Sequence, residues 1–525
     1  MLTVVSFLGF TGFVALWAWY KTKNEKLDSG DGYFLGGRSL TGVVIAGSML
    51  LTNISTEHLI GMNGSSYKNG AIIIAWEVTS ALALVAAAIY FVPKYLRMGL
   101  TTIPQYLENR FDSLTRTLVA MFLIISFVVT LLPIVLYTGA INLESIFNIS
   151  EVFDLTQEEG LWYTVIIVGV VGSMYAIFGG LKAVAVSDTV NGYGLLIGGI
   201  AVPVMALIGI GDGNMIDGMA RVFERAPEKF NVIGSSDSVL PFETLFTGLI
   251  INQLYFWCMN QTIIQRALGA KNLIEAQKGL CYTGVLKIFV PLIIVLPGLI
   301  GFYYFGESLY DNQDMVYPEL IKKVLPGWFV GFFAAVVMGA VLSTFNSVLN
   351  SAATIFSIDI VKKHISPDIN DRKLVMSGKL ASVLLAIFSI ILAPMVAKAP
   401  EGLYQLLQQL NGIFFIPIGS IIIAGFFVPR VSATGAKAAL VTGLGFYIMC
   451  TFILSVDIHF VHIWGIEFLL NMAVMLAVSW RFPNRNPNQE APPPKIEMKT
   501  WRYVKHMGVA LGVVTVLIYS LLAYV

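Results

Sequence analysis

The amino-acid sequence predicts an all-helical membrane protein that crosses the bilayer many times. Of its 525 residues, 56% are hydrophobic and only 12% are charged, and its mean hydropathy is +0.77. Soluble domains carry about 25% charged residues, so this composition is typical of a chain embedded in lipid. Apolar runs recur along the whole chain and leave no segment long enough for a soluble domain. The net charge of +1 gives no reason to expect a nucleic-acid partner.

The apolar runs predict about fourteen crossings, because a transmembrane helix needs roughly 20 apolar residues. The first run has no basic segment before it and lysines directly after it, so we expect a retained helix rather than a cleaved signal. The expected spans are 1–20, 39–64, 69–92, 115–145, 161–180, 186–210, 241–264, 276–304, 326–361, 373–395, 400–428, 433–455, 458–480 and 503–524.

Basic residues are unevenly shared between alternate loops. Most of the 33 lysines and arginines fall in loops on the side of Lys21, for example Lys94, Lys362 and Arg481. The positive-inside rule makes that side cytoplasmic. We therefore expect a multi-pass protein of the plasma (inner) membrane with both termini outside. The Pro-rich segment 481–501 is an expected cytoplasmic linker.

Polar residues interrupt the second apolar run, in the segment LLTNISTEHLIG (50–61). Five of the six positions from Asn53 to His58 carry polar side chains. Unpaired polar groups at membrane depth cost several kcal/mol each, so they are expected to face protein, water or a ligand. One interpretation is two short helices joined by a wet loop. The other is a single broken transmembrane helix whose gap is a binding site, and we favour it because neither flank spans alone.

A second interruption occurs in INQLYFWCMNQ (251–261), centred on Gln253. Five crossings start with each interruption, and an odd number gives the two units opposite orientations. This is the organisation of inverted repeats, in which the broken helices meet near the bilayer midplane. The expected organisation is an N-terminal helix and linker (1–38), a first repeat (39–210), an outer loop (211–240), a second repeat (241–428), two peripheral helices (429–480), the linker (481–501) and a C-terminal helix (502–525).

Two opposite charges stand alone inside apolar runs. Glu77 lies in IIIAWEVTSALAL and Lys287 in GVLKIFVPLIIVLPG. Intramembrane ionisable groups are functional by default, although these two could also form a purely structural pair. Trp76, Phe256 and Trp257 lie beside such polar groups in the sequence, where they either offer apolar faces to a ligand or pack between helices.

Several stretches together resemble the solute:sodium symporter family, and within it the sodium/glucose and sodium/galactose cotransporters. The resemblance covers nearly the whole chain. The stretches are GYFLGGRSL (32–40), NISTEHLIGM (53–62), TIPQYLENRF (102–111), YAIFGGLKA (175–183), QTIIQRALGAKNLIEAQKG (261–279) and LNSAATIFSIDI (349–360).

The resemblance implies a LeuT-type core and a set of sugar contacts. Five residues match the family's sugar-binding identities: Asn53, Glu77, Ser80, Lys287 and Gln408. His58 stands where the bacterial galactose carrier has glutamine and animal glucose carriers have histidine. Gln253 replaces an asparagine, Trp76 replaces a tyrosine under the ring, and Phe256 replaces the tyrosine that gates the sugar from inside. Trp257 completes the expected substrate site.

The resemblance also implies that sodium is the coupling ion. One sodium would bind the carbonyls of Leu51, Ile54 and Ala340 and the hydroxyls of Ser343 and Thr344, oxygen ligands that suit a hard cation. Residues 340, 343 and 344 share one helical face, although small residues there could simply permit close packing. Some members bind a second sodium through an aspartate and two serines. Here Asp188 and Ser347 remain, but Asn346 breaks the serine pair.

The implied function is sodium-coupled import of a neutral monosaccharide, a hexose such as galactose or glucose, and not an enzyme activity. No obvious arginine is available to bind a carboxylate. Alternatives are a symporter of another small solute (myo-inositol, sialic acid or a carboxylate) and a channel or sensor on the same fold. An intramembrane aspartyl protease is a weaker alternative, because its motifs, GxGD ending at Asp212 and YD ending at Asp311, fall in expected outer loops. The oligomeric state does not follow from the sequence.

Overall fold

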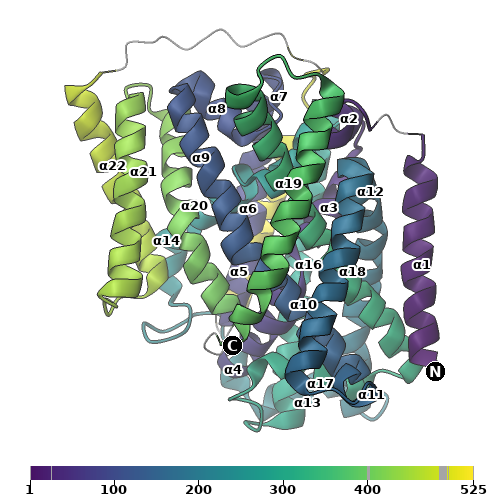
Figure 1. The fold of residues 1–525 in the computed structure, drawn as a ribbon. Helices are drawn as coiled ribbons and strands as arrows, with labels where there is room; N and C mark the ends of the chain where they lie inside the picture. The colour runs from purple at the N-terminus through teal and green to yellow at the C-terminus, as the bar shows by residue number, and fades with distance from the viewer. Residues whose placement is uncertain (1, 25–26, 399–402, 484–493, 495, 524–525) are drawn as a thin grey trace.

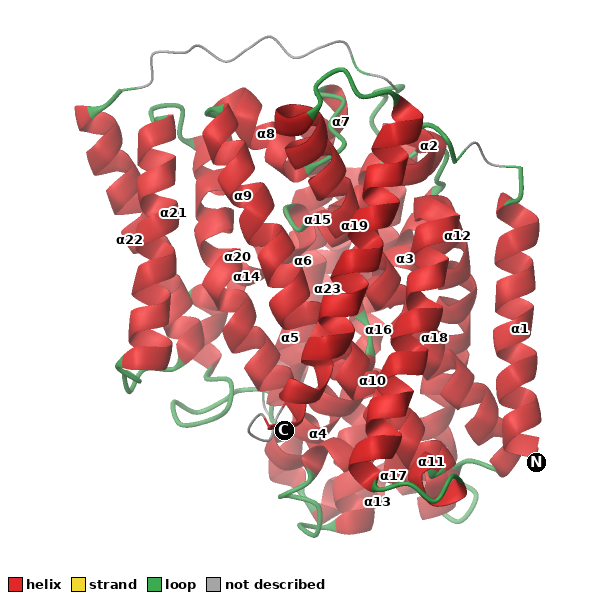
Figure 2. Ribbon diagram, viewed as in Figure 1, coloured by secondary structure: helices red, strands yellow, loops and turns green. Residues whose placement is uncertain are grey.

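The computed structural model describes residues 2–24, 27–398, 403–483, 494 and 496–523, and this part of the chain is almost entirely helical. Within it there is no β-strand beyond one isolated bridge between Leu40 and Ala270. Long helices run side by side through the height of the molecule, as Figures 1 and 2 show. The predicted all-α class is confirmed.

The first half of the chain forms a series of long helices joined by short ones. Its helices are α1 (Leu2–Thr22), α2 (Gly30–Leu35), α3 (Gly42–Asn53), η2 (Glu57–Met62), α4 (Asn63–Asn69), η3 (Ala71–Ile74), α5 (Ala75–Val78), α6 (Ser80–Ala86), η4 (Ala87–Phe91), α7 (Val92–Arg97), α8 (Ile103–Arg110), α9 (Ser113–Ser126), η5 (Phe127–Leu131), α10 (Leu132–Phe147), α11 (Ile149–Val152), α12 (Gln157–Ile210) and α13 (Met215–Arg225).

The second half repeats this pattern and adds peripheral helices. Its helices are α14 (Gly248–Cys258), α15 (Gln261–Leu268), α16 (Leu273–Phe305), α17 (Val316–Val324), α18 (Gly327–Ile355), η9 (Phe356–Ile365), α19 (Asp371–Leu392), α20 (Leu403–Phe427), α21 (Ala433–Ile448), η11 (Met449–Ile453), α22 (Phe460–Arg481) and α23 (Val504–Leu522).

The number of crossings can be compared with the prediction. Eleven described helical segments are long and apolar enough to span a membrane, and the bent pair Gly42–Asn53 and Glu57–Asn69 makes twelve. Each falls on a predicted span. The two other predicted spans, 161–180 and 241–264, coincide with the first part of α12 and with α14 plus α15. The exact number of fourteen is not confirmed. Residues 400–402 of one predicted span, and residues 484–493 and 495 of the expected linker, lie outside the described residues.

A turn at Gly180 divides α12 into two helical segments. Its φ of 60° and ψ of −174° are open chiefly to glycine. A Cβ atom here would lie 2.9 Å from the carbonyl oxygen of Tyr33 in α2. The Tyr33 hydroxyl donates a hydrogen bond to the carbonyl of Ala176 at 3.0 Å, so α2 packs against the turn. The paired glycines of the YAIFGGLKA stretch therefore permit a sharp change of direction between two crossings.

The first interrupted run is a bent helix pair, as predicted. Helix α3 ends at Asn53 because Ile54 takes an extended backbone conformation, with φ −84° and ψ 96°. The chain becomes helical again at Glu57, after a bend of 61°. The hydroxyls of Thr56 and of Thr138 in α10 lie 2.7 Å apart and hydrogen-bond. Because the polar residues of this break are buried in protein, a wet loop between two separate helices does not describe it.

The second interrupted run is also broken. Helix α14 ends at Cys258 and α15 begins at Gln261, with Met259 outside the helical region at φ −135°. The Asn260 side chain accepts a hydrogen bond from the Thr262 N–H at 2.9 Å and so caps α15. Both breaks lie within the bundle, where α3 packs against α12, α16 and α18, and α14 packs against α6 and α20.

Candidate functional site

Two opposite charges meet beside the first break. The Lys287 ammonium of α16 donates hydrogen bonds to Glu77 Oε2 of α5 and to Asn53 Oδ1, the latter at 2.6 Å. The Lys287 and Glu77 side chains are each only 1% exposed. His58 Nε2 of η2 lies 3.9 Å from Glu77 Oε1. Taking such charges out of water is costly unless they are paired and hydrogen-bonded, and this geometry meets that requirement.

The second broken helix reaches the same place through its amide and indole groups. The Gln253 amide donates hydrogen bonds to the carbonyl of Trp76 at 2.7 Å and to the Thr79 hydroxyl at 3.1 Å. Trp257 Nε1 donates to Gln253 Oε1 at 3.1 Å. The Lys287 ammonium lies 5.5 Å from the centroid of the Trp257 ring, within range of a cation–π interaction. The structure thus brings the two interrupted segments together, far apart though they are in the sequence.

These groups line a buried cavity of about 60 Å³ between the two breaks. This volume is well below the range of about 300–1,000 Å³ typical of small-molecule sites, so the walls must separate to admit a monosaccharide. All but one of the expected substrate and gate residues line this cavity. They are Asn53, His58, Trp76, Glu77, Gln253, Phe256, Trp257, Lys287 and Gln408.

Ser80 is the exception. Its buried hydroxyl donates a hydrogen bond to the carbonyl of Glu77, three residues earlier in the chain. A serine near the start of a helical segment often bonds backbone in this way. The structure therefore does not bring Ser80 to the cavity wall, although it supports the backbone of Glu77.

The wall also contains residues that were not among the expected substrate contacts, including Asn252, Tyr404 and Asn411. The Tyr404 ring packs edge-on against His58, with ring centroids 5.4 Å apart, and against Trp76 at 5.8 Å. The side-chain oxygens of Asn252 and Asn411 are buried at the wall and accept no hydrogen bond within the described part of the chain. The sequence carried a signal for two of these residues, since Tyr404 lies one helical turn before Gln408 and Asn252 directly precedes Gln253.

The expected sodium ligands lie in two segments that contact each other, the end of α3 with the residue after it and α18. Leu51, Ile54 and Ala340 are fully buried there, and Ser343 and Thr344 are 2% exposed. The Thr344 hydroxyl donates a hydrogen bond at 3.0 Å to the carbonyl of Thr52, a group the sequence analysis did not include. The Ile54 N–H makes the last helical hydrogen bond, to the carbonyl of Leu50, so the carbonyls that follow at the end of α3 are free to bind other groups. Oxygen atoms from a helix end and two hydroxyls fit a hard cation such as sodium.

Asp188 and Ser347, the residues considered for a possible second sodium, both face a guanidinium. Arg266 of α15 is completely buried, and its Nη2 atom donates a hydrogen bond to the Ser347 hydroxyl. The same atom lies 3.8 Å from Asp188 Oδ2. Ser48 of α3 donates to Asp188 Oδ2 at 2.7 Å and accepts from Arg266 Nε at 3.1 Å. A positive charge carried by the protein therefore stands between the two expected ligands.

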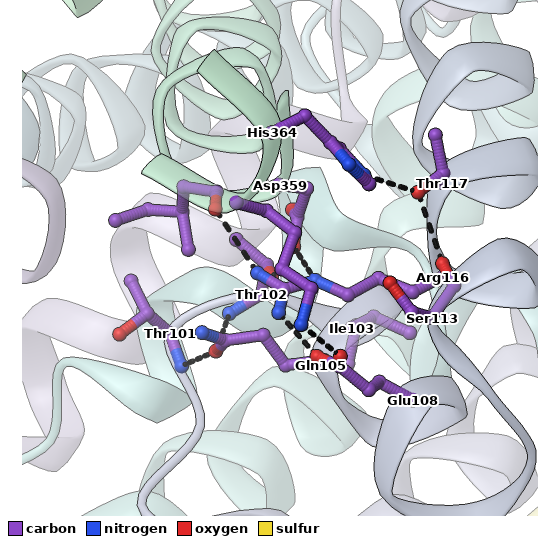
Figure 3. A network of polar contacts seen from close by, with 12 residues as sticks. Thr101, Thr102, Ile103, Gln105, Glu108, Ser113, Arg116, Thr117, Asp359 and His364 are labelled. Atoms are coloured by element: carbon purple, nitrogen blue, oxygen red, sulfur yellow. Dashed lines mark hydrogen bonds and ion pairs between the residues drawn. The ribbon is translucent and has the colours of Figure 1, made fainter. Parts of the chain in front are cut away.

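A second polar cluster joins the helices at the opposite end of the bundle from the start of α1. Figure 3 shows the Arg116 side chain of α9 reaching Asp359 in η9, with an Nε–Oδ1 distance of 2.6 Å. Thr102 donates to the same carboxylate oxygen at 3.0 Å. Glu108 of α8 accepts hydrogen bonds from Arg116 and Lys363. Burial alone would raise the pKa of Glu108, but these two cations outweigh it and leave the pKa lowered.

The two aspartates of the protease alternative lie at the surface. Asp212 follows the end of α12, is 78% exposed and pairs with Arg221 at 2.8 Å. Asp311 is also exposed, in the turns between α16 and α17. That chemistry needs two carboxyls facing each other inside the membrane, and this arrangement does not provide them.

Comparisons with known proteins agree with the resemblance seen in the sequence. The model of the sodium:solute symporter family matches residues 33–443. An uncharacterized symporter of Escherichia coli, YidK, is 42% identical over 99% of this chain and 91% of its own length. A sodium/glucose cotransporter of Vibrio parahaemolyticus is 34% identical over 84% of this chain and 82% of its own.

A solved structure confirms the fold. It is the substrate-bound, outward-open state of a sodium-coupled sialic acid symporter, which is 18% identical and has a TM-score of 0.78 over 93% of this chain and 99% of its own. Such a likeness concerns the fold and not the solute. The predicted LeuT-type core of inverted repeats with two broken helices is confirmed by this match.

Proposed function

Because the chain belongs to the sodium:solute symporter family, we propose that it imports a neutral monosaccharide, a hexose such as galactose or glucose, by sodium-coupled alternating access. The observation that carries this proposal is the cavity between the two broken helices. It combines hydrogen-bond donors, unpaired amide oxygens and tryptophan rings in one buried place. A polyhydroxylated ring offers hydroxyls to both kinds of polar group and an apolar face to the rings.

The charges at the wall favour a neutral solute. In the described part of the chain, the cavity wall contains no arginine, and its one lysine, Lys287, is bonded to Glu77. A carboxylate solute would have to compete with Glu77 for that ammonium. Removing Lys287 from Glu77 would leave a buried carboxylate unpaired, which costs several kcal/mol. A sugar hydroxyl can bond both partners without separating them.

We assign the sugar contacts to Asn53, His58, Trp76, Glu77, Gln253, Trp257, Lys287 and Gln408, with Ser80 in a supporting position. Phe256 is the proposed gate, because it lines the cavity and its ring packs against Trp257 with centroids 5.1 Å apart. An apolar ring in this place blocks a polar solute by size and offers it no hydrogen bond. Opening would require the ring to rotate or α14 to move.

We assign one sodium to the end of α3, with Leu51, Ile54, Ala340, Ser343 and Thr344 as ligands. An ion bound there would fix the unwound backbone that also carries Asn53 and His58. Less conformational entropy is then lost when the sugar binds, so sodium raises the affinity for sugar. By linkage, the sugar raises the affinity for sodium by the same factor. Each positive charge that moves inward gains about 2.3 kcal/mol per 100 mV of membrane potential.

A single sodium per cycle is the stoichiometry that the arrangement around Asp188 supports. Arg266 already supplies a positive charge between Asp188 and Ser347, and Asn346 replaces one of the family's paired serines. We therefore expect uptake to depend on sodium concentration with a Hill coefficient near one.

In the cell, we propose that the protein lies in the plasma (inner) membrane with both termini outside. The start of α1 and the end of α23 lie at the same end of the bundle (Figures 1 and 2), which is consistent with an even number of crossings. The Lys- and Arg-rich loops at the other end would then face the cytoplasm. We place the first repeat in 39–210 and the second in 241–428.

The decisive experiment measures uptake into proteoliposomes of purified protein. Radiolabelled galactose, glucose, myo-inositol, sialic acid and a small carboxylate are each supplied with an inward sodium gradient or an equal potassium gradient. We expect a neutral hexose to accumulate above its outside concentration with sodium only. Accumulation of sialic acid or the carboxylate instead would contradict the proposal. Entry that only equilibrates the solute, whatever the ion gradient, would indicate a channel on the same fold.

A further inference from the structure

A line of hydroxyl contacts leads away from the proposed sodium site toward the second broken helix. The carbonyl of Thr52 accepts a hydrogen bond from Thr344 at the site itself. The hydroxyl of Thr52 lies 3.1 Å from the Ser347 hydroxyl and hydrogen-bonds to it. Ser347 in turn accepts a hydrogen bond from Arg266 of α15. Thr52, at the first break, is thus connected through the Ser347 hydroxyl to Arg266 in the second broken helix.

Arg266 is held by four elements at once. Besides Ser347 in α18, it bonds the Ser48 hydroxyl in α3 at 3.1 Å and the carbonyl of Thr262 in its own helix, and it faces Asp188 of α12 at 3.8 Å. An arginine presents its donors in a rigid planar fork, so a shift of one partner changes the fit of the others. The contacts of the guanidinium therefore depend on the relative positions of α3, α12 and α18.

The rest of α15 is bound to α18 and to the first residue of α8. Gln265 donates to the Thr354 hydroxyl at 2.9 Å and accepts from Ser351 at 2.8 Å. Gln261 accepts a hydrogen bond from the Ile103 N–H at 2.8 Å. By the expected topology α15 is the cytoplasmic half of the second broken helix. Movement of α15 relative to α18 would have to break these contacts.

We propose that Arg266 is a positioning residue that makes the closure of α15 depend on the sodium site, through Thr52 and Ser347. This inference rests on the proposed sodium coupling and adds the route by which the ion acts on the inner half of the second broken helix. With sodium bound, the end of α3 is fixed and Thr52 holds the Ser347 hydroxyl toward Arg266. Without the ion, Thr52 moves with the unwound backbone, Arg266 loses a partner, and α15 separates more readily from α18.

The test is hydrogen–deuterium exchange of the α15 amides in the purified full-length protein, with saturating sodium or with equal potassium. Backbone amides exchange through local opening, so exchange reports how often α15 separates. We expect sodium to slow this exchange by about tenfold or more in the wild type. In Ser347→Ala and in Thr52→Val, which break the link from opposite sides, the sodium effect should fall below about twofold.

Thr56→Val is the matched control. Its hydroxyl also hydrogen-bonds another hydroxyl, that of Thr138, but this bond leads to α10 and not to α18. This variant should keep the full sodium effect on α15. Sodium must still raise the melting temperature of every variant, which shows that the ion still binds.

Three outcomes would overturn the inference. They are a wild type in which sodium leaves α15 exchange unchanged, a Thr52→Val or Ser347→Ala variant that keeps the full effect, and a variant that no longer binds sodium, which would make these hydroxyls ion ligands rather than links. Failure of the proposed function is distinguishable, because it would appear as an absence of sodium-driven solute accumulation in the wild type.

Discussion

The ammonium nitrogen of Lys287 lies 2.6 Å from the side-chain oxygen of Asn53. This hydrogen bond joins the middle of α16 directly to the last residue of α3, where the first break begins. Lys287 also bonds Glu77 of α5. The charge pair is therefore tied to the broken backbone, and any movement of the break that accompanies ion or solute binding must alter the pair.

Lys287→Ala and Glu77→Gln should each lower solute uptake at least about a hundredfold, because removing one partner of a buried pair costs roughly 3–5 kcal/mol. Uptake is measured at matched amounts of protein in the membrane. Lys278→Ala is the control, since this lysine of the same helix pairs with Glu275 at a site 31% exposed. A Glu77→Gln/Lys287→Ala double variant that transports normally would show that the pair is only structural.

Ser343→Ala and Thr344→Ala should each raise the sodium concentration for half-maximal uptake about tenfold. Each substitution removes one oxygen from the proposed ion site, and a contact with a charged group is worth roughly 1.5–3 kcal/mol. Ser389→Ala serves as the control, because that hydroxyl bonds only its own helix, at the carbonyl of Leu385. The assignment of this site is wrong if the Ser343→Ala/Thr344→Ala variant keeps the wild-type sodium curve.

His58→Gln should change the ranking of hexose epimers more than it changes sodium affinity. The imidazole and the amide both donate and accept, but with different geometry. A site built to bond a hydroxyl discriminates most strongly against the analogue that lacks it. The measurement is competition by deoxy and epimeric sugars at saturating sodium. An unchanged ranking would place His58 outside the sugar contacts, as a residue that merely packs against Tyr404.

Arg116→Ala should lower the apparent melting temperature of the purified protein by about 5 °C or more, because it leaves the buried Asp359 carboxylate without its cation. Arg116→Lys keeps the charge but cannot bond Asp359, Glu108 and the Ile358 carbonyl together, so an intermediate loss is expected. Arg372→Ala, at an exposed position, should have little effect. Equal losses in Arg116→Ala and Arg372→Ala would contradict this account.

Glu108→Gln should destabilise the protein at pH 7 but not in acid. The pKa of Glu108 is lowered in the folded state, despite burial, by its bonds with Lys363 and Arg116. A lowered pKa gives a contribution to stability that is complete above the usual glutamate pKa of about 4.3 and is lost as the pH falls further. The difference in melting temperature between wild type and variant should therefore shrink below about pH 4. A difference independent of pH would exclude this ion-pair origin.

The broken helices were predictable because polar residues inside an apolar run carry a large and local free-energy cost. Asn53 is the last residue before the first break for this reason, whereas Gln253 lies inside α14, six residues before the second break at Met259. The change of direction at Gly180 was also within reach, since two apolar runs meet at a pair of glycines. The number of crossings was less certain, in part because the second broken helix consists of α14 and α15, each of which is too short to span alone.

The partners of buried polar groups were harder to predict. Arg266 lies in a stretch that carries the family resemblance, yet its position between Asp188 and Ser347 depends on helices that are distant in sequence. Buried charges are normally paired, so an arginine in this apolar setting is expected to lie near an anion such as Asp188. Ser80 illustrates a related difficulty: a serine hydroxyl can bond its own helix as easily as a ligand, and residue type alone does not decide between the two.

The end of α3 gives the sodium site a property that no side chain carries. The C-terminal end of a helix bears roughly half a negative charge from its unpaired carbonyls, whichever residues supply them. Side-chain substitutions at Leu51 or Ile54 would leave this charge in place. A genetic screen for lost ion binding should thus recover changes at Ser343 and Thr344 far more readily than at Leu51 or Ile54. Point mutations therefore do not remove the backbone carbonyls that contribute to the site. Residues around the break can vary where their side chains make no other essential contact.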